Sequence, residues 1–160
     1  MVAAPGHCDD HVGFWFEEER ALFTGDAVLG EGSTVFTNLR TYMASLRKFL
    51  DLAPAQLYPA HGRDIGGTVE GGASAAVAHI EAYIANRQAR EDQVVAFLER
   101  AAGGGDAATL EDLVADIYAA YPKSLWPAAG NSLLLHMAKL EEESRVVGSR
   151  ETGWRLAADD

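Results

Sequence analysis

Three short stretches of the sequence carry side chains that could bind a metal ion, and each lies in a turn beside a short apolar run. They are Ala4-Pro5-Gly6-His7-Cys8-Asp9-Asp10-His11, Thr24-Gly25-Asp26 and Tyr58-Pro59-Ala60-His61-Gly62. Imidazoles and carboxylates are zinc ligands, and loops at strand ends can bring them together from distant parts of a chain. No single stretch would be persuasive, but the set of three predicts a hydrolytic zinc site.

The composition is that of a folded globular protein with one ordinary domain or two small ones. The chain has 160 residues, of which 48% are hydrophobic and 23% charged. Its net charge of −11 would repel a polyanion unless the bases were gathered in one patch. Cys8 is the only cysteine, so no disulfide can form within the chain. No apolar run reaches the roughly 18–20 residues that span a membrane, and no secretory signal is readable.

The first part of the chain is predicted to be short strands around one helix. Alternation and aromatic content favour strands, charge favours a turn, and a stripe from Leu39 to Leu50 at helical spacing favours a helix. We expect strands over 12–16, 21–24 and 56–58, a turn over 17–20, and a helix that starts near Thr37 or Asn38 and stops at Pro54.

The second part is predicted to be helical, after a glycine-rich segment at 66–72 that marks a boundary. We therefore expect domains over 1–75 and 76–160. A long helix should end before Gly103, and Thr109 with Asp112 should form a capping box for the next helix. That helix carries the stripe Leu110, Leu113, Val114, Ile117 and Tyr121. A third helix over about 131–143 and a hairpin from 145–148 and 153–156 complete a winged-helix arrangement.

These motifs resemble the metallo-β-lactamase superfamily, and more narrowly its lactamase-beta-like 2 branch, whose animal members are endoribonucleases on single-stranded RNA. The glycine-flanked His and Asp motifs are shared across the superfamily, whereas Leu29-Gly30-Glu31-Gly32 and the block 131–141 are more specific to the branch. The resemblance implies an α/β (α+β) fold, namely the C-terminal half of an αββα sandwich followed by a helical winged-helix domain. The residues that carry the resemblance are 5–11, 24–32, 58–62, 87–91 and 131–141.

The resemblance also implies a ligand set for two Zn²⁺ ions. His7 would complete the first zinc site, Asp26 would bridge the two metals, and His61 would bind the second zinc. The superfamily's main motif, His-x-His-x-Asp-His, does not occur in this sequence. We therefore expect the chain alone to bind metal weakly and to be weakly active or inactive, as a truncated gene product or fragment would be. Apolar surface on the strands and on the 39–50 helix should then be exposed.

Several neighbouring residues invite a structural interpretation beside a functional one. His11 is expected to orient a ligand rather than bind metal, and Asp10 could do the same or be a turn residue like Asp9. Cys8 matches no ligand position and is expected to pack. The residues Arg87, Arg90 and Glu91 are expected to form an ion-pair network at the domain junction rather than to touch substrate.

The sequence thus favours a zinc-dependent hydrolase of the endoribonuclease-like branch that acts on single-stranded RNA. Two alternatives stay open: a thioester or ester hydrolase on the same motifs, or a non-catalytic interaction or regulatory half-domain. Residues 76–160 hold 8 bases against 14 acids. We therefore expect the winged helix to form a wall of the cleft and not to bind double-stranded DNA. The expected location is the cytoplasm or mitochondrial matrix, without secretion or membrane binding.

Overall fold

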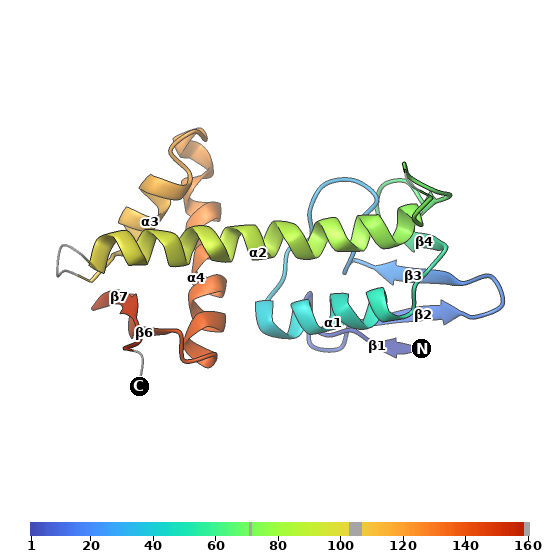
Figure 1. Cartoon of the computed structure of the whole chain (residues 1–160), viewed down its shortest axis with the longest axis horizontal. Coiled ribbons are helices and arrows are strands. Elements are labelled where there is room, and N and C mark those ends of the chain that lie inside the picture. Colours follow the sequence, from blue (N-terminus) through green and yellow to red (C-terminus); the bar gives the residue numbers. More distant parts are fainter. Residues whose placement is uncertain (71, 103–106, 159–160) are drawn as a thin grey trace. The chain divides into compact units, whose positions relative to one another are not determined.

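A computed structural model describes residues 1–70, 72–102 and 107–158 (Figure 1). The chain divides into two compact units, Met1–Arg87 and Gln88–Asp160, and this division falls inside one continuous helix, α2. The domain limits predicted at 1–75 and 76–160 stay a prediction. The elements are β1 (Val2–Ala3), β2 (Val12–Phe16), β3 (Ala21–Gly25), α1 (Leu39–Asp51), β4 (Gln56–Pro59), β5 (Ile65–Gly66), α2 (Ala75–Ala102), α3 (Leu110–Ile117), the 3₁₀ helix η1 (Lys123–Leu125), α4 (Trp126–Glu142), β6 (Val146–Ser149) and β7 (Gly153–Leu156).

The first unit is built on a five-stranded sheet in the order β1-β2-β3-β4-β5. The pair β3 and β4 is parallel and is joined through α1, while the other pairs are antiparallel. The three predicted strands are confirmed as β2, β3 and β4. The strands β1 and β5 were not predicted, because two residues are too few to show an alternating pattern.

Helix α1 covers one face of this sheet. Asn38 caps it, since its side-chain oxygen accepts a hydrogen bond from the Thr41 amide at 2.9 Å. A side chain at Gly13 of β2 would come within 2.9 Å of the Phe49 ring, so strand and helix pack closely. The expectation of exposed apolar surface on this helix is therefore wrong, because its stripe is buried: Leu39, Tyr42, Met43, Leu46 and Phe49.

The opposite face of the sheet carries exposed aromatic side chains, as expected for the strands. Phe14 pairs with Phe23 across β2 and β3, and Phe23 pairs with Tyr58 across β3 and β4. The rings of Phe23 and Tyr58 stack with centroids 4.9 Å apart. Their exposed fractions are 56% for Phe14, 46% for Phe23 and 41% for Tyr58, so this aromatic face is open to water.

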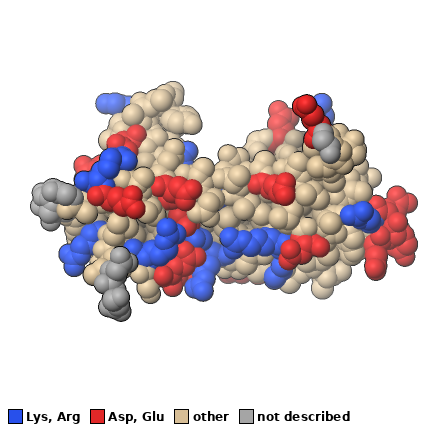
Figure 2. Space-filling model, in the orientation of Figure 1, with Lys and Arg blue, Asp and Glu red and all other residues tan. Residues whose placement is uncertain are grey.

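The turn between β2 and β3 is charged, as predicted. Glu17, Glu18, Glu19 and Arg20 are all exposed there. Figure 2 shows the resulting group of acidic side chains at the end of the sheet where this turn lies. No helix in the described parts of the chain combines the length and the apolarity needed to cross a bilayer.

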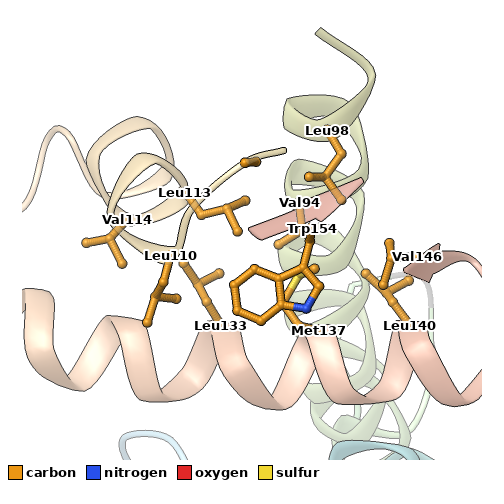
Figure 3. Close-up of a cluster of buried hydrophobic side chains, with 11 residues drawn as sticks. Val94, Leu98, Leu110, Leu113, Val114, Leu133, Met137, Leu140, Val146 and Trp154 are labelled. Atoms are coloured by element: carbon orange, nitrogen blue, oxygen red, sulfur yellow. The ribbon is translucent and has the colours of Figure 1, made fainter. Parts of the chain in front are cut away.

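In the second unit, side chains from α2, α3, α4 and the β6–β7 hairpin form a hydrophobic core. Thr109 and Asp112 form the predicted capping box of α3. Trp154 of β7 lies amid side chains from α2, α3 and α4 (Figure 3). The buried members of this core are Val94, Leu98, Ala108, Leu110, Leu113, Val114, Leu133, Met137, Leu140, Val146 and Trp154.

Two predicted details of this unit are wrong. Helix α4 begins at Trp126 rather than near residue 131, because Pro127 suits the first turn of a helix, where its missing N–H costs nothing. Tyr121 lies beyond the end of α3 and is 50% exposed, so it does not extend the buried stripe.

The predicted ion-pair network exists around Glu91, but with other partners. The Glu91 carboxylate is buried and accepts hydrogen bonds from Lys139 at 2.6 Å and Arg145 at 2.7 Å. Arg87 instead donates to the Ser33 hydroxyl at 2.6 Å, and Arg90 lies over the Tyr118 ring at 4.3 Å. The grouping of Arg87 and Arg90 with Glu91 in one network is therefore wrong.

Candidate metal centre

The sheet topology brings the three predicted ligand loops to one edge. Because β3 and β4 are parallel neighbours, with Gly25 opposite Pro59, the residues that follow both strands emerge at the same edge. Asp26 follows β3 and His61 follows β4. Strand β2 runs antiparallel to β3, so the loop before β2, which carries His7, reaches that edge as well.

Asp26 lies between the two imidazoles. His61 Nε2 is 3.3 Å from Asp26 Oδ1, and His7 Nε2 is 4.0 Å from Asp26 Oδ2. Two ligands of one tetrahedral zinc ion lie about 3.3 Å apart, so the His61 pair matches this spacing and the His7 pair is wider. Each oxygen of the carboxylate thus faces a different imidazole, which is the arrangement of a bridging ligand.

The tautomer of His7 suits metal binding. Its Nδ1 lies 2.7 Å from the Val35 carbonyl oxygen, which can only accept, so Nδ1 carries the proton. In the neutral ring with this tautomer, the lone pair of Nε2 lies on the side of Asp26. A backbone acceptor on the remote nitrogen is the usual support of a ligating histidine.

The side chains of His7, Asp26 and His61 are of types that bind zinc, but they are too few to complete a zinc site. In the described part of the chain, no group of three or more His, Cys, Asp and Glu side chains is close enough together to hold a metal ion. His7 and His61 each form a pair with Asp26. The two pairs do not together form a complete set of ligands around one metal ion.

His11 holds the backbone of Asp26 in place. The Asp26 N–H donates to His11 Nε2 at 3.2 Å, and the His11 ring meets the His7 ring edge-on at 5.8 Å between centroids. Burial lowers the pKa of His11, which favours the neutral ring that accepts this bond. Gly25 leaves room for the ring, because a Cβ there would lie 2.8 Å from His11 Nε2.

Asp10 and Cys8 lie beside each other in the same loop. Asp10 is exposed, and its hydrogen bond with the Cys8 thiol raises the pKa of that thiol. The structure therefore brings His11 to Asp26 and brings Asp10 to Cys8. The predicted role of Asp10 as a partner of the ligands stays a prediction.

The loop around His61 is joined to the loop that follows Asp26. The Gly30 N–H donates to the His61 carbonyl at 2.8 Å, and the Ala60 N–H donates to the Gly25 carbonyl at 3.0 Å. A Cβ on Gly30 would lie 1.9 Å from the Arg63 carbonyl oxygen. Gly30 is thus needed for the close approach of these two backbone segments.

One side of α2 fixes the loop over 29–34, which sequence reasoning missed. His79 donates to the Leu29 carbonyl at 2.8 Å, Tyr83 accepts from the Leu29 N–H at 3.1 Å, and Arg87 donates to Ser33. These three side chains are spaced four residues apart and so share one face of the helix. This four-residue spacing is the sequence pattern from which a shared helix face could have been predicted.

The same loop reaches the ligand region. The Thr34 hydroxyl donates a hydrogen bond to the Asp26 carbonyl. Arg87 also donates to the Thr34 carbonyl at 3.4 Å. Helix α2 therefore supports Asp26 through Thr34, in addition to the direct support from His11.

Two family models match the regions just described. The model of the metallo-beta-lactamase superfamily matches residues 1–61, which include His7, Asp26 and His61. The model of the beta-lactamase associated winged helix domain matches residues 109–154, from the cap of α3 to β7. The chain therefore carries part of a metallo-beta-lactamase domain over 1–61 and a beta-lactamase associated winged helix domain over 109–154. Its second unit contains the predicted winged-helix domain.

The curated relatives that this chain matches are longer than the chain. The beta-lactamase-like protein 2 homolog of Caenorhabditis elegans is 39% identical over 146 residues, which cover 91% of this chain and 45% of that protein. An atrochrysone carboxyl ACP thioesterase of Claviceps purpurea is 39% identical over 115 residues, or 71% of this chain and 34% of that protein. The chain thus spans about half the length, or less, of these curated relatives.

A solved structure supports the fold. A beta-lactamase domain protein from Burkholderia ambifaria superposes with a TM-score of 0.73 and 21% identity. The match covers 99% of this chain and 47% of that one. The mixed α/β fold predicted from the sequence is confirmed by this likeness and by the strands and helices of the structure.

Proposed function

We propose that His7, Asp26 and His61 are part of the dinuclear zinc centre of a hydrolase. The observation that carries this proposal is the Asp26 carboxylate, whose two oxygens face two different imidazoles at 3.3 and 4.0 Å. The three side chains are ligand types that zinc takes, and the hydrogen bond from His7 Nδ1 to the Val35 carbonyl oxygen leaves Nε2 of that ring on the side of Asp26.

The residues of this chain would bind and orient, and the metal would supply the reactive chemistry. Zinc supplies Lewis acidity and a nucleophilic water near neutral pH. Asp26 would be shared between two ions, His7 would serve the first and His61 the second. Since a catalytic zinc takes about three protein ligands, each ion needs further ligands from another polypeptide segment.

Single-stranded RNA is the substrate class that we propose first. It rests on the resemblance to the lactamase-beta-like 2 branch, and the similarity to a relative of that name supports it. A thioester is the second candidate, favoured by the similarity to a protein named as an acyl carrier protein thioesterase. Both reactions need an ester-type centre to be attacked at the same metal pair.

Equilibrium dialysis against Zn²⁺ tests the metal centre. We expect weak binding by the chain, a loss of at least about tenfold in affinity for Asp26→Asn, and smaller losses for His7→Asn and His61→Asn. Asp9→Asn is the matched control, because it removes an exposed carboxylate from the same loop as His7. Binding that is unchanged in Asp26→Asn would exclude the proposed centre.

Assays of the zinc-loaded chain separate the substrate classes. A single-stranded RNA oligonucleotide and a small acyl thioester should be offered in parallel, with Asp26→Asn as the blank. We expect slow, zinc-dependent RNA cleavage that is absent in the variant. Turnover of the thioester alone identifies the second candidate as correct. Turnover of neither substrate fits both an incomplete hydrolase and the non-catalytic alternative, which the zinc affinities of the variants then separate.

A further inference from the structure

The winged-helix unit contains a cavity of about 450 Å³ between α3 and the start of α4. Leu110 and Val114 of α3 line it together with Trp126 and Gly130 of α4. Figure 3 shows Leu110 and Val114 on the side of α3 that faces α4. The volume lies within the range of small-molecule sites, and the lining would bury an apolar body.

The polar residues of this cavity favour an anion. Lys123 and Arg150 line it, against the single acid Glu111. The Lys123 ammonium lies over the Trp126 ring, 5.4 Å from its centroid. This excess of one positive charge, on a chain whose net charge is −11, matches a ligand with one negative charge.

The first turn of α4 adds to this preference. The helix begins at Trp126 without a side-chain cap hydrogen bond, and its first turn holds no acidic residue. The positive end of the helix dipole is therefore not neutralised locally. Of these first-turn residues, Trp126 and Pro127 line the cavity, so the field of the dipole acts on its contents.

The indole of Trp126 is a donor without an acceptor. Its Nε1 is buried and has no hydrogen-bond partner among the described residues. A buried N–H without a partner is costly and uncommon in folded proteins. The ring that carries this N–H lines the cavity, so its resonance reports on what the cavity holds.

We propose that this cavity binds a small amphipathic carboxylate. Its apolar body would lie against Leu110, Val114 and the Trp126 ring. Its carboxylate would meet Lys123 and Arg150. This site lies wholly in the winged-helix unit and is independent of the metal centre, so either proposal can fail alone.

Binding of 2-naphthoate to ¹⁵N-labelled chain tests the proposal. The three tryptophans Trp15, Trp126 and Trp154 give three indole N–H resonances, and Trp126→Phe identifies the one that matters. We expect 2-naphthoate to shift the Trp126 resonance in a saturable way. The neutral 2-naphthamide should bind about tenfold more weakly, because the amide lacks the charge.

Charge variants sharpen the test. We expect Lys123→Gln and Arg150→Gln each to weaken 2-naphthoate binding by about tenfold, while Arg155→Gln, whose arginine does not line the cavity, leaves it unchanged. The Trp154 resonance should stay in place in every variant, because its buried indole donates to Glu141 and reports an intact core. A Trp126 resonance that does not move at millimolar 2-naphthoate overturns the proposal. Equal affinity of the Lys123→Gln/Arg150→Gln double variant, or a shift confined to Trp15, does the same.

Discussion

The open sheet face of the first unit and the core of the second unit differ in the exposure of their aromatic side chains. In the first unit, Phe14, Phe23 and Tyr58 line up across three strands with between 41% and 56% of their surface exposed. In the second unit, Trp154 is 3% exposed at the centre of a core closed by its own helices and hairpin. A unit that buries its largest side chains can be stable by itself. An aromatic sheet face in water is a surface that further protein normally covers.

The largest effect should come from the closed core. Trp154→Ala removes the ring at its centre and the hydrogen bond to Glu141, and should lower the free energy of unfolding by about 3–5 kcal/mol. Urea titration followed by circular dichroism measures this. Val147→Ala in the same hairpin is the control, because Val147 is 42% exposed and should change stability by less than about 0.5 kcal/mol. Equal effects would show that the second unit is not closed as described.

The buried ion pair should come next. Glu91→Ala removes the 2.6 Å partner of Lys139, whose side chain is 8% exposed and which keeps Glu143 at 2.8 Å, and should cost about 2 kcal/mol. Glu91→Leu combined with Lys139→Met should recover most of that loss, since no buried charge is then left unpaired. Glu99→Ala, an exposed position on the same helix, should have little effect. A double variant as unstable as Glu91→Ala would contradict this account.

A smaller effect is expected at the cap of α3. Thr109→Ala removes half of the capping box and should cost about 1 kcal/mol. The hydrogen bonds from Thr109 hold the pKa of Asp112 below its ordinary value. This contribution is therefore present above the pKa of the unfolded chain and is lost as the pH falls through the lower pKa of the folded chain. Unfolding curves between pH 7 and 3 should show a larger loss in the parent than in Thr109→Ala, because the variant keeps the hydrogen bond from the backbone N–H of residue 109 to Asp112.

The smallest effect on stability is expected on the open face. Phe23→Ser should lower the free energy of unfolding by at most about 1 kcal/mol, through the lost stack on Tyr58, and should reduce self-association, measured by light scattering. Leu22→Ser is the matched variant on the opposite face of the same strand, where Leu22 is fully buried. It should destabilise strongly, because it puts a hydroxyl into the core. If Phe23→Ser were as damaging, the face would not be open.

The sequence predicted those parts of the fold that depend on local patterns. The stripe from Leu39 to Phe49 with its Asn38 cap, and the Thr109–Asp112 box, are fixed by residues within a few positions of one another. The convergence of His7, Asp26 and His61 followed from loops at strand ends. Whether these three bind metal remains a prediction.

Long-range partners could not be predicted in the same way. Glu91 pairs with Lys139 and Arg145, which are 48 and 54 residues away, and nothing in the local pattern distinguishes them from Arg87 and Arg90. The contacts from His79, Tyr83 and Arg87 to the loop 29–34 depend on how α2 packs within the first unit. Only their four-residue spacing was visible in advance.

The contact between Gly30 and Gly62 has a consequence for protein engineering. A Cβ on Gly62 would lie 2.4 Å from the Glu31 amide, just as one on Gly30 would strike the Arg63 carbonyl. The backbones around Gly30 and Gly62 therefore approach too closely for a side chain at either position. A graft of this region onto another scaffold would have to transfer residues 29–34 and 60–63 together as one cassette, since a foreign loop on either side would carry a side chain into its neighbour.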